Sequence, residues 1–424
     1  MPSIYRLLRY LERYTKTDMV YLANAGTWTN LHFVITSILA LLLSVAYANF
    51  LSPETFGLYQ FFLSLAAVVT ALTLAGMNSA VAQAVARGYE GVLRDSVRAQ
   101  IRWAIVPFLA GMLGSVYYVI QGNLVIATGL ALVAVLAPLT SVFNTYAAYL
   151  SGKREFKRGF LYALVIAAAY YASIFAAVYY LEDAVLLIVV NLGINALATA
   201  FVYWRTLRRY QPGDTKDPEA ITYGKHLSVM NAFGTIITQL DSILVFHFLG
   251  AAGLALYTFS IGIPDRVGSL SKFISVAALP KFSNQSLAEI RRHILGKLVK
   301  AALAGLVLAV AFALAAPLIF KLLFPAYLAA VPYAQLFALN ITMAAVLNLS
   351  VTALIAQRLK RELYIYNLGN PVVLLALQVP LLIWFGIWGI LVAKLISNAF
   401  NIVFSTALIF HGHQKDESLL ERPG

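Results

Sequence analysis

The stretch FLGAAGLALY, residues 248–257, repeats the frame of an earlier stretch, FLSPETFGLY, residues 50–59, at a distance of 198 residues. Both begin with Phe-Leu, keep the same spacing to a tyrosine and stand between two long apolar runs. A second pair, KREF from Lys153 and KREL from Lys360, lies 207 residues apart. Repeats at corresponding places predict two parallel halves, related by an axis along the membrane normal.

The composition is that of an integral membrane protein. Hydrophobic residues make up 61% of the 424 residues and charged residues only 12%, whereas about a quarter of the residues in a soluble protein are charged. The chain has no cysteine and six scattered histidines. This excludes disulfides and thiol chemistry, and we expect no metal site and no cofactor.

Twelve apolar runs reach the length of roughly 20 residues that a helix needs to cross a bilayer. They predict an all-α fold of about twelve transmembrane helices in two six-helix lobes. The expected spans are residues 27–50, 56–80, 101–120, 124–150, 159–180, 184–205, 226–249, 253–279, 297–320, 328–356, 363–384 and 387–411.

The basic residues are distributed unequally between the two sides of the membrane. If the N-terminus is cytoplasmic, 27 of the 31 Lys and Arg lie in cytoplasmic segments, and Lys321 is the only one in an outside loop. This asymmetry predicts cytoplasmic termini and an even number of spans. The net charge of +13 is therefore explained by topology, and no nucleic-acid partner is expected.

The longest hydrophilic break, LRRYQPGDTKDPEA at 207–220, divides the spans into six and six. Near the N-terminus, residues 3–17 place basic and apolar side chains on opposite helical faces, which is typical of a helix on an anionic membrane surface. The predicted organisation is an N-terminal interfacial helix and lead at 1–26, an N-lobe at 27–206, a cytoplasmic linker at 207–222, a C-lobe at 223–412 and a cytoplasmic tail at 413–424.

Away from the cytoplasmic ends of the predicted spans, five charged residues lie within them, all in the second half: Arg266, Lys272, Lys394, Asp241 and Asp265. Each costs about 2.5 to 3.5 kcal/mol at the centre of a membrane helix on insertion scales, so none should face lipid. Asp265 and Lys272 are seven residues apart, which places them on one face of a regular helix. We expect the three cations to bind an anionic ligand and the two acids to orient them. A buried salt bridge between Asp241 and Arg266 is the structural alternative.

Polar stripes accompany these charges and predict a shared wet cavity. The alternative is that the polar side chains only join helices by hydrogen bonds. The expected cavity-lining residues are Asn231, Thr235 and Thr238 on the seventh span and Asn398 and Asn401 on the twelfth.

The first half differs, because its spans contain only neutral polar groups. No coupling-ion site is predicted there, and His32 is interpreted as a packing residue. The neutral polar residues are Asn24, His32, Asn144, Asn191 and Asn195.

Several segments resemble the Wzx-type polysaccharide flippases of the multidrug/oligosaccharidyl-lipid/polysaccharide (MOP) exporter superfamily. The first is FLSPETFGLYQFFLSLAAVVTALTLAGMNSAVAQAVARG at 50–88, and its counterpart is QLDSILVFHFLGAAGLALYTF at 239–259 followed by ALPKFS at 278–283. The resemblance extends to span number, lobe division and loop charge over essentially the whole chain. Pro264, Asp265 and Arg266 match no motif of the family, so their role depends on the physical argument alone.

The resemblance implies a transporter of the cell membrane, without enzyme activity, that moves polyprenyl-diphosphate-linked oligosaccharide from the inner to the outer leaflet by alternating access. It implies a lipid-linked glycan substrate, membrane lipids and polysaccharide-assembly proteins as partners. Two alternatives stay open at this point. A cation-coupled multidrug exporter of the same superfamily would place acids without surplus cations in its cavity. A membrane-embedded glycosyltransferase or polymerase would need catalytic carboxylates or a sizeable loop domain.

Overall fold

The computed structural model describes residues 19–412, and all its regular elements in that range are helices. The interfacial helix predicted at 3–17 and the tail predicted at 413–424 lie outside the described residues. The elements are α2 (Met19–Phe50), α3 (Pro53–Ala71), α4 (Met77–Ala86), α5 (Val92–Trp103), α6 (Ile105–Ile120), α7 (Leu124–Phe143), α8 (Thr145–Gly152), α9 (Phe156–Tyr180), α10 (Ala184–Tyr210), α11 (Ala220–Ser269), α12 (Lys272–Ser283), α13 (Leu287–Leu323), η1 (Pro325–Ala330), α14 (Val331–Phe337), α15 (Leu339–Ala356) and α16 (Lys360–His411).

Ten helical segments in the described range are long and apolar enough to cross a membrane, and two of them are long enough to cross twice. Each of these two contains one glycine with a non-helical backbone, Gly250 in α11 (φ 74°, ψ −173°) and Gly386 in α16 (φ 57°, ψ −133°). A left-handed φ reverses the chain between two spans and favours glycine. Counting each as two spans gives twelve crossings, so the predicted number of about twelve is confirmed.

Short polar turns join several of the other spans. Ser52, Asn123 and Asp183 precede α3, α7 and α10, and the side-chain oxygen of each accepts a hydrogen bond from a backbone N–H of the first turn. Such caps satisfy amides that a helix start leaves without partners. The chain can therefore re-enter the membrane after only two or three residues.

The predicted repeat has a structural counterpart in both pairs of stretches. Ser52 and Gly250, 198 residues apart, both lie at the turn between two spans. The turns at Arg154 (φ 60°) and Arg358 (φ 52°) share one hydrogen-bond pattern, with Glu155 N donating to Leu150 O and Leu359 N to Leu354 O. These turns correspond at a shift of 204, so the register of 207 inferred from KREF and KREL is wrong by three residues.

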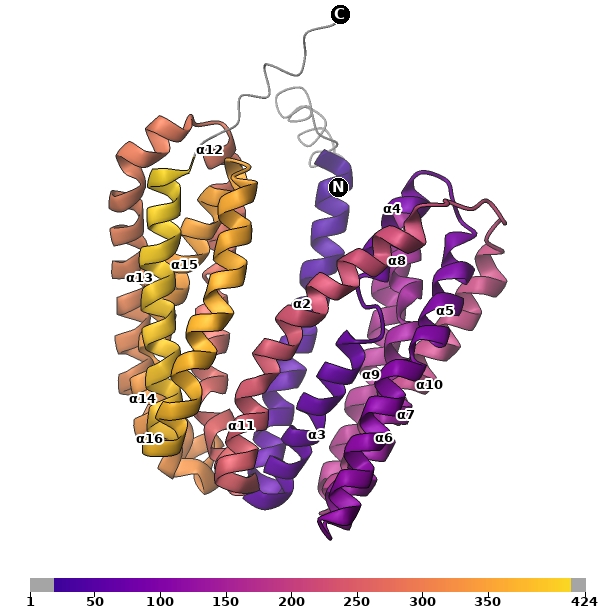
Figure 1. Ribbon diagram of the computed structural model, residues 1–424, viewed down its shortest axis with the longest axis horizontal. Helices are drawn as coiled ribbons and strands as arrows, with labels where there is room; N and C mark the ends of the chain where they lie inside the picture. Colours follow the sequence, from indigo (N-terminus) through magenta and orange to yellow (C-terminus); the bar gives the residue numbers. More distant parts are fainter. Residues whose placement is uncertain (1–18, 413–424) are drawn as a thin grey trace, which may run out of the picture. The chain divides into compact units, whose positions relative to one another are not determined.

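The chain forms two compact units, one ending at Ile243 and the other beginning at Leu244. Within the first, α6, α7, α9 and α10 pack side by side, and within the second α13, α15 and α16 do so (Figure 1). The first unit continues beyond the predicted linker because the linker is bonded to it: Gly91 N donates to Thr215 O (3.0 Å), and Arg94 pairs with Asp214 (3.1 Å). The predicted lobe boundaries at 206 and 223 stay a prediction.

The second span is interrupted, although the sequence predicts one continuous helix at 56–80. Helix α3 ends at Ala71 and α4 starts at Met77, and between them Leu74 adopts a left-handed φ of 61°. The hydroxyl of Thr73 donates to the carbonyl of Thr70, which competes with helical bonding. The indole N–H of Trp103 donates to the freed Leu72 carbonyl (3.0 Å), so this oxygen is satisfied outside the helix.

The backbone at Gly250 gives a direct test of the hairpin between the seventh and eighth spans. A Cβ at this position would touch nothing within 4 Å, so only the backbone conformation opposes a side chain. Gly250→Ala should destabilise the protein by about 1 to 3 kcal/mol, because this region of φ and ψ is essentially restricted to glycine.

The matched control is Gly234→Ala, at a helical position with equal space, where alanine should be neutral or stabilising by up to about 1 kcal/mol. Melting temperatures of the purified protein in detergent measure both effects. Equal melting of Gly250→Ala and the natural protein would show that the helix does not reverse at Gly250.

Candidate functional site

A chain of polar side chains connects three helices of the second unit. The amide of Asn340 on α15 donates to Asp265 Oδ1 on α11 (2.8 Å), and the amide of Asn398 on α16 donates to Asn340 Oδ1 (2.7 Å). The structure therefore brings together two residues predicted for the site, Asp265 and Asn398, through Asn340, which the sequence analysis did not identify. A carboxylate that accepts a hydrogen bond from an amide is stabilised in its charged form.

Lys394 on α16 lies among aromatic side chains. Its ammonium donates to the hydroxyl of Tyr257 (3.0 Å) and lies 5.5 Å from the centre of that ring and 5.9 Å from the ring of Phe337. The lysine is half-buried. Aromatic faces attract a desolvated cation, which compensates part of the cost of keeping it in the membrane.

Arg266 and Lys272 are both exposed on the second unit, but they belong to different helices. The α-helical bonding stops between them, because Leu270 and Ser271 donate to carbonyls only three residues back. The Ser271 hydroxyl also donates to Gly268 O (2.6 Å). The helix between Asp265 and Lys272 is therefore not regular, since it is interrupted at 270–271. The expectation that the two residues share one face stays a prediction.

The remaining predicted residues differ in burial and in the unit to which they belong. Asn401, in the second unit, is buried, and so is Asp241, which is 5% exposed in the first unit. Thr235 and Thr238 also lie in the first unit, and their hydroxyls donate to carbonyls of their own helix, at 3.1 and 2.8 Å. These bonds satisfy the hydroxyl donors. Asn231 beside them is exposed.

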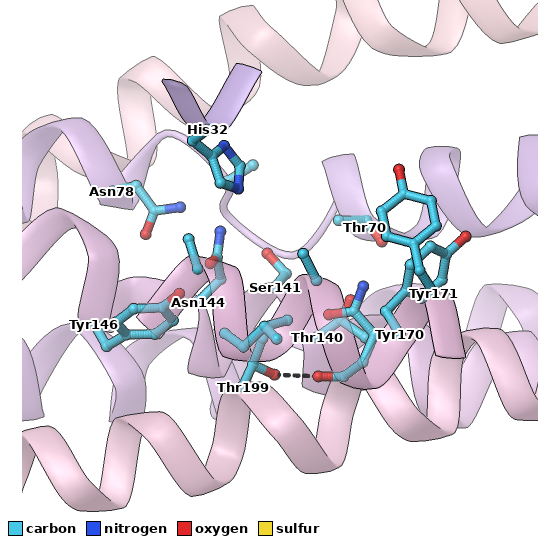
Figure 2. A pocket seen from close by; sticks show the side chains of 15 residues that line it. His32, Thr70, Asn78, Thr140, Ser141, Asn144, Tyr146, Tyr170, Tyr171 and Thr199 are labelled. Atoms are coloured by element: carbon cyan, nitrogen blue, oxygen red, sulfur yellow. Dashed lines mark hydrogen bonds between the residues drawn. The ribbon is translucent and has the colours of Figure 1, made fainter. Parts of the chain in front are cut away.

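The first unit contains a pocket of about 500 Å³ that the sequence analysis did not predict. Figure 2 shows His32, Asn78 and Asn144 at one end and Thr70, Tyr170 and Tyr171 at the other. The pocket is lined by His32, Thr70, Ala75, Asn78, Thr140, Ser141, Asn144, Tyr146, Ala163, Ile166, Ala167, Tyr170, Tyr171, Asn195 and Thr199.

The pocket is neutral, in contrast to the charged residues of the second unit. Among the described residues that line it there is no Asp, Glu, Lys or Arg. Two interrupted helices meet at it, since Asn78 follows the break between α3 and α4, and Asn144 separates α7 from α8. Asn144, Asn195 and His32 stood out in the sequence as polar residues in apolar spans, but only the fold shows that they share one cavity.

A family model described as "polysaccharide biosynthesis protein" matches residues 22–285, more than half of the 424-residue chain. The chain therefore belongs to the polysaccharide biosynthesis protein family. A search of curated proteins finds no match to the sequence.

Solved structures show the fold. An inward-facing multidrug resistance MATE family transporter of the MOP superfamily has a TM-score of 0.68 at 12% identity, with 91% of this chain and 98% of the other covered. The lipid II flippase MurJ in an inward closed conformation gives 0.66 at 10% identity, with 90% and 87% covered. A MOP superfamily transporter from Pyrococcus furiosus, whose binding pocket of reverse polarity suggests a different function, gives 0.52 at 12% identity, with 92% and 95% covered. The expected MOP fold is confirmed.

Proposed function

We propose that the protein translocates polyprenyl-diphosphate-linked oligosaccharide from the inner to the outer leaflet of the cell membrane by alternating access. The product would supply the synthesis of a cell-surface polysaccharide. Membership of the polysaccharide biosynthesis family supports the glycan part of this proposal. The observation that supports the diphosphate part is the excess of Lys and Arg over Asp and Glu within the predicted spans of the second unit.

That unit contains Arg266, Lys272 and Lys394 but only Asp265 as an acid within its predicted spans. A charged side chain is costly within a membrane span, so an excess of Lys and Arg over Asp and Glu is expected where an anionic ligand binds. A diphosphate presents several acceptor oxygens to which Arg and Lys donate charge-assisted hydrogen bonds. The lipid tail can stay in the bilayer during transport.

The geometry at Lys394 suits a reversible anion contact. Its ammonium has three donors, one of which goes to the neutral hydroxyl of Tyr257. Asp265 is linked through Asn340 to Asn398, four residues along α16 from Lys394. Lys394 and Asn398, which is linked through Asn340 to Asp265, therefore lie one turn apart on α16. This arrangement supports the proposal that Asp265 orients the cation.

A cavity for organic cations would have the opposite balance. Such a ligand is held most strongly by carboxylates in a site without competing cations. The described lining of the first unit's pocket has no carboxylate, and the second unit has surplus positive charge in its spans. The charge distribution therefore favours an anionic lipid-linked glycan over a cationic drug.

Arg266→Gln, Lys272→Gln and Lys394→Gln should each reduce flipping of lipid-linked oligosaccharide by about tenfold or more. A charge-assisted hydrogen bond is worth roughly 1.5 to 3 kcal/mol, and 1.4 kcal/mol corresponds to a factor of ten. Flipping is measured in reconstituted vesicles with equal amounts of each variant.

Lys321→Gln is the matched control, because Lys321 is an exposed lysine near the end of α13. It should flip at the natural rate. Natural rates for all three test variants would refute the cationic site. Destabilisation of Arg266→Gln that is rescued by removing an acid would instead indicate a structural ion pair.

The direction of transport requires the linker to be cytoplasmic. Because the chain has no cysteine, single cysteines report topology without background. We expect Glu219→Cys in the linker to be protected from an impermeant maleimide in intact cells. Glu182→Cys, in the exposed turn before α10, should react. Both positions avoid the capping residue Asp183. Labelling of Glu219→Cys from outside would reverse the proposed orientation.

A further inference from the structure

Asn78, which lines the pocket of the first unit, carries a buried hydrogen-bond acceptor that no group of the described residues satisfies. The side-chain Oδ1 of Asn78 has no hydrogen-bond partner within the described residues. A buried acceptor without a partner costs about 1 to 3 kcal/mol, so its presence needs an explanation. Asn144 and Asn195 line the same pocket, and each amide brings two donors and an acceptor.

Three hydroxyl groups in the lining of the pocket donate to backbone carbonyls. Thr140 and Thr199 donate to carbonyls of their own helices at 2.8 and 2.7 Å, and Tyr171 donates to Thr36 O at 3.1 Å. Their oxygens keep lone pairs, so these residues offer acceptors. The pocket therefore combines amide donors with several acceptors, which is the pattern that sugar hydroxyls require because each both donates and accepts.

The backbone around the pocket also has the form of a binding site. Residues 72–76 are not helical, and Leu74 among them has a left-handed φ. Thr70, Ala75 and Asn78, which lie within this segment or beside it, line the cavity. Non-helical backbone within a membrane span is tolerated where it is covered by protein or lines a cavity, and interrupted helices mark substrate sites in transporters. Strained backbone at such a place indicates function.

The composition of the pocket identifies the chemical class of its ligand. A phosphate would require Arg or Lys, and an organic cation would favour a carboxylate; the described lining has neither. The volume of about 500 Å³ lies within the range of small-molecule sites. Tyr146, Tyr170 and Tyr171 supply aromatic faces, on which the C–H face of a pyranose can stack.

We propose that this pocket binds uncharged sugar residues of the substrate, with Asn78, Asn144 and Asn195 hydrogen-bonding to hydroxyls and Tyr170 packing against a sugar ring. The inference depends on the proposed function, since the sugar residues are those of the proposed glycan substrate. It names the part of the substrate that this neutral cavity recognises.

The test uses full-length protein in detergent with Ala163→Cys, a reporter in the lining of the pocket. Its rate of reaction with N-ethylmaleimide is measured with maltose, lactose or N,N′-diacetylchitobiose, and separately with pyrophosphate or tetraphenylphosphonium. At a disaccharide concentration about ten times its dissociation constant, labelling should slow by about tenfold. Leu161→Cys, on the exposed face of the same helix, should react at an unchanged rate.

Asn78→Leu combined with the Ala163→Cys reporter distinguishes a binding role of Asn78 from a structural role. It removes the unsatisfied acceptor, so the melting temperature should be unchanged or higher while protection by sugar is lost. Asn195→Ala should likewise reduce protection.

No protection by any of the three disaccharides, or protection by tetraphenylphosphonium instead, would overturn the inference. A lower melting temperature of Asn78→Leu with protection retained would also overturn it. If the cation variants lose flipping but no sugar protects the Ala163→Cys reporter, the proposed function stands and only this sugar site is refuted. Sugar protection with natural flipping in those variants would keep this site and the flippase function and would refute only the cationic site of the second unit.

Discussion

The interaction on which this structure depends is the hydrogen bonding of polar groups in a medium that offers no water. In hydrocarbon every backbone amide and carbonyl must be paired, which is why the described chain is helical and why its turns are short and capped. The same requirement applies to side chains. Thr36 and Ser44 in α2, for example, donate to carbonyls of their own helix. A polar group that departs from this rule is a reason to look for a ligand.

Two features with different chemistry bear on the proposed substrate. In the second unit, the cations exceed the acid within the spans, and the acid is held by a chain of amides from Asp265 to Asn398. In the first unit, the buried oxygen of Asn78 has no partner among the described residues, and the surrounding pocket is neutral. A lipid-linked glycan has the two corresponding parts, a charged diphosphate and uncharged sugars. On the proposed function, each unit recognises one part.

Much of the fold could be predicted because membrane spans leave a strong signal in apolar run length. The sequence even indicated the turn at Gly250, where FLGAAGLALY follows the seventh span. It did not reveal the break at 72–76, because Leu72 and Leu74 continue the apolar pattern while the Thr73 hydroxyl disrupts the helix. The interruption before Lys272 was missed for a similar reason: Ser271 bonds locally to Gly268 O. Local side-chain competition of this kind does not alter hydrophobic length.

The site was less predictable than the fold. Charged residues in apolar spans can be found from composition alone, which is how Arg266, Lys272 and Lys394 were selected. A neutral pocket has no such signal, since Asn78, Asn144 and Asn195 lie far apart in sequence and polar residues often join helices. Only the fold brings its wall together, because α10 packs against both α7 and α9 and the wall also includes residues of α2, α3 and α4.

The most direct test of the central claim, that the protein binds the anionic diphosphate of a lipid carrier, is ligand-induced stabilisation of the purified protein. Its melting temperature is compared in detergent containing undecaprenyl diphosphate, undecaprenol or no added lipid. A ligand that binds only the folded state raises the free energy of unfolding by RT ln(1 + L/Kd), where L is the free ligand concentration, and the melting temperature rises with it. We predict a rise with the diphosphate that decreases with salt and is absent with undecaprenol. Equal stabilisation by the diphosphate and the uncharged alcohol would contradict the account.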